Sequence, residues 1–261
     1  RVFAVSRTAQ PESAGVQWLR GGLDHVDGFP LPRRVDAIIS CGPLDHFGRW
    51  YAATTLDAPR VVAFGSTSVE VKQDSCDAHE RDLALRLRDG ERAVFAAATA
   101  RGAAATVLRP TLVYGAGRDR TLTRIAQLAG RWGRFVLPRD ACGLRQPVHV
   151  ADLAAAAHAC IDSTASHGHG YALPGAETLP YREMVARVLA ALQPPRPLLL
   201  LPAPVFATAV MAARLLGRGD ALAAVVARMR EDLVFDATPA RRHFGYAPRP
   251  FQPDATMFSA D

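Results

Sequence analysis

Residues 60–69 read RVVAFGSTSV, and this stretch decides the fold. Its apolar core, residues 61–64, has the length of a buried strand, and the glycine and hydroxyl residues that follow end the strand in a turn. Asp77 and Glu80 then have the spacing of a helix capping box, and apolar residues recur at helical spacing after them. A second apolar run at residues 105–108 follows this helix. A strand, a long crossover helix and another strand predict two parallel neighbours in one sheet.

The segments on either side repeat this alternation. Apolar runs at residues 2–5, 15–19 and 37–40 indicate further buried strands. Residues 122–132 have the apolar spacing of a helix, and Asp152 is placed to cap the alanine-rich helix that follows it. We therefore predict an α/β fold built on a doubly wound parallel sheet.

The alternation weakens after residue 170. We predict a helix over residues 181–192, a buried loop and helix in the proline-punctuated apolar stretch 198–213, and a short strand over residues 233–235. These elements predict a smaller lobe beside the main sheet.

The composition excludes several classes of protein. With 49% hydrophobic and 21% charged residues, the chain is neither disordered nor fibrous. The net charge of +6 comes from scattered arginines that form no runs or stripes, so we expect no nucleic-acid partner. The apolar stretch 198–213 holds Pro202 and Pro204 and falls short of the roughly 20 residues of a membrane span, so we expect no membrane partner.

The pattern of cysteines favours a reducing compartment, and the pattern of histidines indicates no metal site. The four cysteines show no C-x-x-C pairing, which is typical of the cytosol, and we predict a cytoplasmic protein. His167 and His169 have no cluster of cysteines or carboxylates beside them. We therefore predict a loop at these histidines and no metal site.

Three segments carry a resemblance to a known family. They are residues 64–69 (FGSTSV), 108–115 (LRPTLVYG) and 145–152 (RQPVHVAD), and they stand in this order along the chain. They resemble the extended short-chain dehydrogenases/reductases, especially the NAD-dependent epimerase/dehydratase group that acts on nucleotide sugars. The resemblance implies a Rossmann-like sheet with a nicotinamide cofactor at the carboxyl ends of its strands.

The resemblance also implies a division of the chain. Residues 1–169 would form the NAD(P)-binding domain, and residues 170–261 would form a smaller substrate-binding lobe that is interleaved with it and not independent. The family's glycine-rich turn should precede residues 2–5, where this sequence has none. We therefore expect a sheet without its first strand and helix, which would belong to a longer protein, a natural truncation being the alternative.

The cofactor residues follow from the same resemblance. NAD-preferring relatives place an acidic residue at the end of the second strand, and NADP-preferring relatives place serine or arginine there. This chain has Ser6 and Arg7, so we predict NADP, with NAD as the alternative. The alternative to cofactor binding is that Arg7 is an ordinary loop residue. For Gly42, the alternative is that the glycine only makes a turn. The remaining residues expected against the cofactor are Cys41, Gly42, Pro110, Thr111 and Val113.

The family's catalytic machinery is incomplete in this sequence. Ser66 matches its serine, but the Tyr-x-x-x-Lys pair is missing, because Leu83 and Leu87 stand at the two places. The tyrosine moves the proton in the family, and leucine can transfer none. Lys72, the sole lysine, is the remaining candidate for a catalytic role beside Ser66.

Two functions are open on this evidence, and the sequence does not decide whether the protein is an enzyme. One is an atypical NAD(P)-dependent oxidoreductase or epimerase that transfers hydride on a nucleotide sugar. The other is a catalytically silent NAD(P)-binding sensor or assembly protein of the same fold. A homodimer is compatible with both.

The substrate residues are again those the resemblance implies. Tyr114 would open the substrate cleft, and Arg145 would approach the diphosphate of a nucleotide sugar, since a guanidinium suits phosphate oxygens. Arg228 and Arg230 are both candidates for a second phosphate-binding arginine, because either one fits the resemblance to the family's closing segment. The alternative for all three arginines is a solvated position in a loop or at a helix end. His149 is expected to pack at the base of the cleft.

Overall fold

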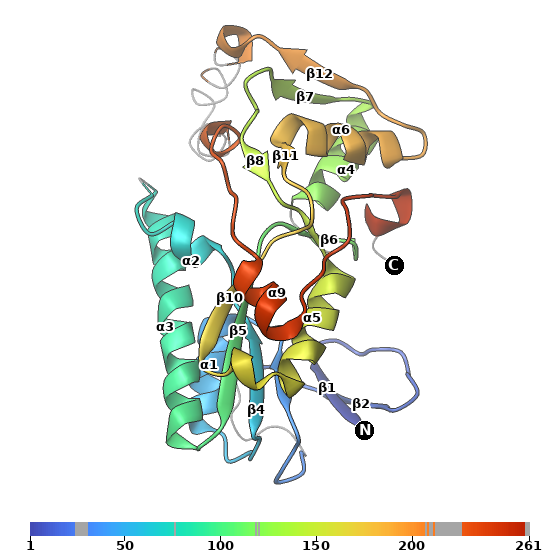
Figure 1. Cartoon of the computed structure of the whole chain (residues 1–261). Coiled ribbons are helices and arrows are strands. Elements are labelled where there is room, and N and C mark those ends of the chain that lie inside the picture. Colours follow the sequence, from blue (N-terminus) through green and yellow to red (C-terminus); the bar gives the residue numbers. More distant parts are fainter. Residues whose placement is uncertain are drawn as a thin grey trace. The chain divides into compact units, whose positions relative to one another are not determined.

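The computed structural model describes residues 1–23, 31–75, 77–117, 119, 121–206, 208, 211 and 226–258. The chain forms two compact units (Figure 1). Unit 1 comprises Arg1–Arg109, Ala156–Tyr171 and Arg242–Gly245. Unit 2 comprises Pro110–Ala155, Ala172–Arg241 and Tyr246–Asp261.

Unit 1 is built on a four-stranded sheet. Its strands are, in spatial order, β10 (His169–Leu173), β5 (Ala104–Pro110), β4 (Arg60–Phe64) and β3 (Ile38–Ser40). The strands β3, β4 and β5 are parallel, and Val62 of β4 is paired with Ile39 on one side and Thr106 on the other. A parallel pair β1 (Val2–Ser6) and β2 (Val16–Arg20) forms a separate sheet. The predicted α/β fold with a parallel sheet is confirmed.

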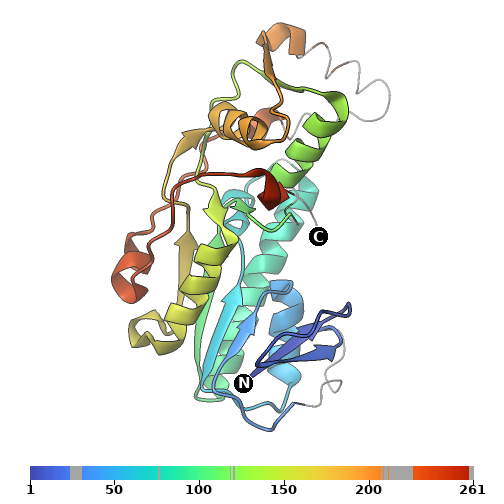
Figure 2. The ribbon, with the colours of Figure 1, turned by 90° about the vertical axis from the view of Figure 1, so that its right-hand side faces the viewer.

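Helices cover both faces of the four-stranded sheet, as a doubly wound fold requires. Figure 2 shows the sheet between α1 (Leu44–Ala53) and α3 (Ala78–Ala100) on one face and the second half of α5 (Val150–Asp162) on the other. A short helix, α2 (Ser68–Val71), follows β4, and η1 (Thr164–Ser166) precedes β10. The core between α1, α3 and the sheet includes Phe47, Tyr51, Val61, Val94 and Val107.

The crossover helix α3 begins where the sequence predicts. The Asp77 carboxylate accepts a hydrogen bond from the His79 N–H at 2.8 Å, and the Asp77 N–H donates to Ser75 Oγ at 3.2 Å. Gly90 lets α3 approach α1 closely, because a Cβ there would lie 2.8 Å from the Asp45 backbone nitrogen. The start of α3 thus depends on Asp77, and its packing against α1 depends on Gly90.

Unit 2 combines short sheets with two longer helices. The helices are α4 (Leu122–Trp132) and α6 (Tyr181–Ala191), and their core includes Ile125, Met184, Val188 and Phe251. The strands pair as β6 (Val113–Tyr114) with β9 (Val148–His149), β7 (Phe135–Pro138) with β12 (Leu198–Leu201), both parallel, and β8 (Leu144–Arg145) with β11 (Leu179–Pro180), antiparallel. The remaining elements are α9 (Thr238–Phe244) and η2 (Ala255–Phe258).

Three local predictions are wrong. Asp152 does not cap α5, because the helix already begins at Val150. Residues 233–235 form no strand, although the Leu233 N–H donates to the Leu144 carbonyl at 2.9 Å. The apolar stretch after residue 197 begins with the half-exposed strand β12 and not with a buried loop, because β7 offers it a parallel partner. Part of that stretch lies outside the described residues.

The two compact units do not follow the sequence-based division at residue 169. Residues 110–155 are part of unit 2, and residues 242–245 are part of unit 1. The strand β10 and the helix α5 each contribute residues to both units. The assignment of residues 1–169 to cofactor binding and of residues 170–261 to substrate binding stays a prediction.

Candidate functional site

The parallel strands of unit 1 bring three of the predicted site residues to one edge of the sheet. Cys41 and Gly42 follow β3, and Ser66 follows β4 after one glycine. Ligands of open parallel sheets bind at the carboxyl ends of the strands. A Cβ at Gly42 would lie 2.8 Å from Leu23 Cδ1, so this glycine also has a packing role.

Ser66 is oriented by the turn that joins β4 to α2. Its Oγ accepts a hydrogen bond from the Ser68 N–H at 3.1 Å. The preceding Gly65 N–H donates to the Leu108 carbonyl of β5 at 2.8 Å. The hydroxyl is half-buried, and its own proton is free to be donated to another oxygen.

An ion-pair network next to this turn joins three elements. Arg109 of β5 binds Glu91 of α3 through two hydrogen bonds, Nε to Oε1 at 2.8 Å and Nη2 to Oε2 at 2.6 Å. Its Nη1 donates to Glu70 of α2 at 2.9 Å. The hydrogen bonds to Glu91 raise the pKa of Arg109 in spite of its partial burial. Sequence reasoning missed this network, although an arginine immediately before the strand-ending Pro110 was a usable signal.

Lys72 is held against α3 and not left free. Its Nζ lies 3.3 Å from Oε1 of the buried Glu80, whose other oxygen accepts a hydrogen bond from Ser75 Oγ at 2.7 Å. Leu83 and Leu87, at the places of the family's tyrosine and lysine, are half-buried residues of α3. A catalytic role for Lys72 stays a prediction, and it would act from within this ion pair.

Of the two candidate cofactor residues at the end of β1, Ser6 is hydrogen-bonded and Arg7 is not, within the described residues. The Ser6 Oγ accepts hydrogen bonds from the Thr8 N–H at 3.3 Å and from Gln10 Nε2 at 3.1 Å. The exposed Arg7 has no ion pair or hydrogen bond within the described part of the chain. Its guanidinium is therefore available to a phosphate.

In unit 2, the structure places Tyr114 in the core. Its side chain is 2% exposed, and its ring packs edge-on against His149 and Phe251 with centroid distances of 5.1 and 4.9 Å. Gly115 follows with φ of 113°, and a Cβ there would lie 2.4 Å from His149 Nε2. Burial, and then the charge of Arg249, lower the pKa of His149. Substrate contact by Tyr114 stays a prediction.

The neighbouring cofactor candidates are part of the same backbone framework. The Thr111 N–H donates to the Leu173 carbonyl at 3.3 Å, and Val113 of β6 is paired with Val148 of β9. Pro110 is the last residue of β5. The contact of these residues with a nicotinamide stays a prediction.

Arg145, the predicted diphosphate ligand, is 5% exposed. Its Nη1 donates to the carbonyls of Leu144 and Glu231 at 2.7 and 2.6 Å, and its Nη2 donates to the carbonyl of Arg228. The guanidinium also lies over the ring of Tyr181 at 5.4 Å, and burial lowers its pKa. In this arrangement Arg145 fastens residues 228–231 to β8, and its contact with a diphosphate stays a prediction.

Two further acid–arginine pairs fix the segments around these candidates. Arg230 Nε donates to Asp140 Oδ2 at 2.8 Å in an exposed pair. The Asp152 carboxylate accepts hydrogen bonds from Arg249 Nε at 2.8 Å and from the Arg249 backbone N–H at 3.0 Å. Asp152 therefore serves as the partner of Arg249 and not as the cap of α5.

The described residues contain neither a metal-ligand cluster nor a helix that could cross a membrane. No group of three or more histidine, cysteine or acidic side chains lies close enough to hold a metal ion in this part of the chain. Among the same residues, no helix combines the length and the hydropathy that crossing a bilayer requires.

Comparison with known proteins gives a family-model match over part of the chain. Residues 55–173 match the model of the NAD dependent epimerase/dehydratase family. A curated relative, 2-alkyl-3-oxoalkanoate reductase of Stenotrophomonas maltophilia (strain K279a), is 32% identical over 161 residues, which are 56% of this chain and 47% of that protein. The match therefore spans about half the length of this relative.

Solved structures share the fold at low sequence identity. The structure of MoeE5 in complex with UDP-glucuronic acid and NAD is 16% identical, with 98% of this chain and 89% of that chain covered and a TM-score of 0.67. The UDP-glucuronic acid 4-epimerase of Bacillus cereus, in complex with a deoxyfluoro analogue of UDP-glucuronic acid and NAD, is 11% identical, with coverages of 99% and 88% and a TM-score of 0.65. At these sequence identities the comparison shows a shared fold and nothing further.

Proposed function

Because residues 55–173 match the model of the NAD dependent epimerase/dehydratase family, we propose that this chain binds a nicotinamide dinucleotide and acts by hydride transfer on a nucleotide sugar. The observation that carries the proposal is the common edge of β3 and β4, where Cys41, Gly42 and Ser66 follow parallel strands. When bound, the dinucleotide supplies or accepts the hydride.

Ser66 has the geometry to orient a substrate oxygen. Because its Oγ already accepts from the Ser68 N–H, its hydroxyl proton is left to donate to a carbonyl or hydroxyl oxygen at the reacting carbon. Arg109 and its carboxylate partners fix α2 beside this turn and so hold Ser68 in place. The chain's own contribution is therefore orientation and hydrogen bonding at the edge of the sheet.

The test of Ser66 is turnover. NADP(H) absorbance and the products, separated by chromatography, would be followed with UDP-sugars, dTDP-sugars and a 2-alkyl-3-oxoalkanoate, the substrate class named for the curated relative. We expect Ser66→Ala to lower kcat by about a hundredfold. Ser68→Ala, the matched control, keeps the backbone donor and should leave kcat within about threefold. Wild-type protein that turns over none of these compounds would contradict the proposal.

We further propose that the cofactor is NADP, because Arg7 is exposed and unengaged within the described residues. Its guanidinium suits the additional phosphate of that cofactor. Arg7→Glu should raise the Kd for NADPH by at least about tenfold and leave the Kd for NADH nearly unchanged. The control is Arg49→Glu, which reverses the charge of an exposed arginine on α1. Equal affinities of the wild type for NADPH and NADH would contradict the proposed NADP preference.

A second candidate function is favoured by the environment of Lys72. With leucines at positions 83 and 87 and Lys72 engaged by Glu80, the described part of unit 1 contains no free lysine or tyrosine at the places where the family moves its proton. A catalytically silent sensor or assembly protein would bind NADPH and turn over none of the substrates. Its cellular activity would then survive Ser66→Ala and be lost with Arg7→Glu.

A further inference from the structure

The parallel strand pair β7 and β12 of unit 2 presents an apolar face to solvent. The pair lies beside α4 and α6 (Figure 1), and Leu137 and Leu198 pack into the core that these helices share. Val136 and Leu199 are partners in the strand register, and their side chains are 36% and 38% exposed. One side of the pair therefore belongs to the core, and the other is in contact with solvent.

Two further exposed apolar side chains belong to the same segments. Trp132, the last residue of α4, stands three residues before β7 and is 63% exposed. Leu200 of β12 follows Leu199 and is also exposed. We call Trp132, Val136, Leu199 and Leu200 the β7/β12 face. Exposed apolar side chains that are neighbours, unlike those that occur singly, mark a docking surface.

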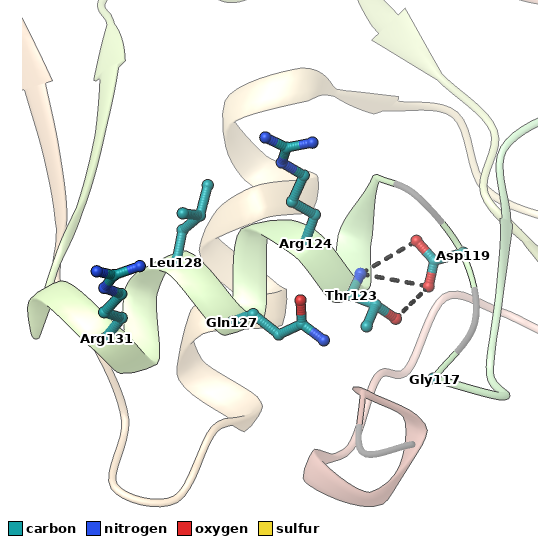
Figure 3. Close-up of a pocket in the computed structure, with 7 residues that line it drawn as sticks. All are labelled: Gly117, Asp119, Thr123, Arg124, Gln127, Leu128 and Arg131. Atoms are coloured by element: carbon teal, nitrogen blue, oxygen red, sulfur yellow. Dashed lines mark hydrogen bonds between the residues drawn. The ribbon is translucent and has the colours of Figure 1, made fainter.

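The segments that carry the β7/β12 face are basic. Residues 121–139 and 192–211 include five arginines and neither aspartate nor glutamate. The exposed Arg134 and Arg139 stand immediately before and after β7, and Figure 3 shows Arg131 extending from the last turn of α4. The side chains of these three arginines make no ion pair or hydrogen bond with another described residue. Asp140, the next acid along the chain, is held by Arg230, so the positive charge is not balanced locally.

The combination of apolar and basic side chains defines the partner. A lipid headgroup region accepts tryptophan and leucine side chains at its boundary with the acyl chains, and anionic headgroups attract arginine. A nucleic acid would engage the arginines but leave the exposed aliphatic side chains without an apolar partner. The sequence-based expectation of no membrane partner rests on the length of a membrane span, and docking at a bilayer surface requires no span.

We propose that the β7/β12 face docks on the surface of an anionic lipid bilayer. The four apolar side chains of the face enter the headgroup region, and Arg131, Arg134 and Arg139 bind lipid phosphates. The proposal does not depend on which cofactor or substrate the protein uses. It predicts peripheral binding that is strong on anionic lipid, weak on zwitterionic lipid and reduced by salt.

The test of the apolar contribution is co-sedimentation of the protein with phosphatidylglycerol vesicles. We expect Trp132→Ser/Leu199→Ser to weaken binding by at least about tenfold. The matched control is Trp18→Ser/Leu85→Ser, which removes an exposed tryptophan and an exposed leucine of unit 1 and should change binding by less than about twofold. A wild type that does not sediment with these vesicles, or equal losses in the two variants, would overturn the proposal.

The test of the charge contribution compares phosphatidylglycerol with phosphatidylcholine vesicles. The wild type should bind the anionic vesicles at least about tenfold more tightly, and Arg131→Gln/Arg134→Gln should remove most of this difference. The control, Arg49→Gln/Arg242→Gln, neutralises two exposed arginines of unit 1 and should retain it. A preference for anionic vesicles that both variants lose equally would assign the binding to net charge and contradict docking through this face.

Tryptophan fluorescence tests the orientation on the bilayer. Trp132 should enter a less polar environment on docking, so the emission of the wild type should shift to shorter wavelength with phosphatidylglycerol vesicles. Trp132→Phe keeps an apolar side chain and should bind without this shift, whereas Trp18→Phe should bind and keep it. A shift that depends on Trp18 would place the contact in unit 1 and refute the proposal.

A second copy of the chain is the other occupant that the test distinguishes. Light scattering measures the mass of the wild type and of Trp132→Ser/Leu199→Ser in solution. The proposal predicts that the substitutions leave the mass unchanged. A dimer that these substitutions convert to a monomer, in a protein that ignores phosphatidylglycerol vesicles, would overturn lipid docking in favour of self-association.

Discussion

At the scale of single residues, the most consequential contact in unit 1 is the double hydrogen bond between Arg109 and Glu91. The Glu91 side chain is 9% exposed, so its replacement leaves a guanidinium without its principal partner in a largely buried place. Glu91→Gln should lower the free energy of unfolding by about 3 kcal/mol. Glu70→Gln, at the more exposed end of the same arginine, should cost less than about 1 kcal/mol. Urea denaturation measures both, and equal losses would show that the pair at Glu91 is not the dominant one.

His149 should make unit 2 sensitive to mild acid. Burial and Arg249 lower its pKa in the folded state, whereas Asp152 and Asp254 act in the opposite direction. The neutral ring is therefore the form that the fold favours, and the stabilisation is complete above the ordinary pKa of 6.5. It is lost progressively as the pH falls from that value through the lowered pKa of the folded state.

The measurement is the free energy of unfolding between neutral pH and pH 5 for the wild type and His149→Gln. The wild type should lose stability over this range, and the variant should lose less because it has no ring to protonate. Some slope should remain, since burial also lowers the pKa of His167 in unit 1. A variant with the full wild-type slope would show that His149 does not contribute.

At the scale of elements, two helical glycines should respond in opposite directions to the same substitution. In α3, a Cβ at Gly90 would lie 2.8 Å from the Asp45 backbone nitrogen, so Gly90→Ala must separate α3 from α1. We expect a loss of about 1–3 kcal/mol. In α4, Gly130 has no atom within 4 Å of the same position, and Gly130→Ala should stabilise by up to about 1 kcal/mol. Thermal melting of both variants compares them, and a stabilising Gly90→Ala would contradict the close packing of the two helices.

The sequence predicts elements well where their signals are local. The strand over residues 61–64 and the helix that Asp77 caps depend on neighbours within a few positions, and the structure confirms both. Asp152 was misassigned because its partner, Arg249, is distant in sequence, and only folding brings the two together. The same limitation applies to Arg145, since nothing local to it reveals the carbonyls of residues 228–231.

The candidate site divides in the same way. That Cys41, Gly42 and Ser66 follow strands of one parallel sheet could be predicted, because carboxyl ends of parallel strands share an edge. The engagement of Lys72 by Glu80 could not, because a sequence pattern does not specify which of several acids a lysine will meet.

At the scale of the whole molecule, the central claim is that the family's cofactor binds to this chain. The evidence for the claim consists of the match of residues 55–173, the parallel sheet and the unengaged Arg7. The NADP preference, the nucleotide sugar and the roles of Ser66 and Lys72 all depend on it. A measurement of dinucleotide binding therefore precedes every test of turnover.

That measurement is thermal unfolding of the protein with NADPH, NADH or no addition. A ligand that binds only the folded state stabilises it by about 2.7 kcal/mol at a hundred times its Kd. We predict that NADPH raises Tm clearly and more than NADH does. A protein that melts cooperatively at one Tm whether or not either dinucleotide is present would contradict cofactor binding.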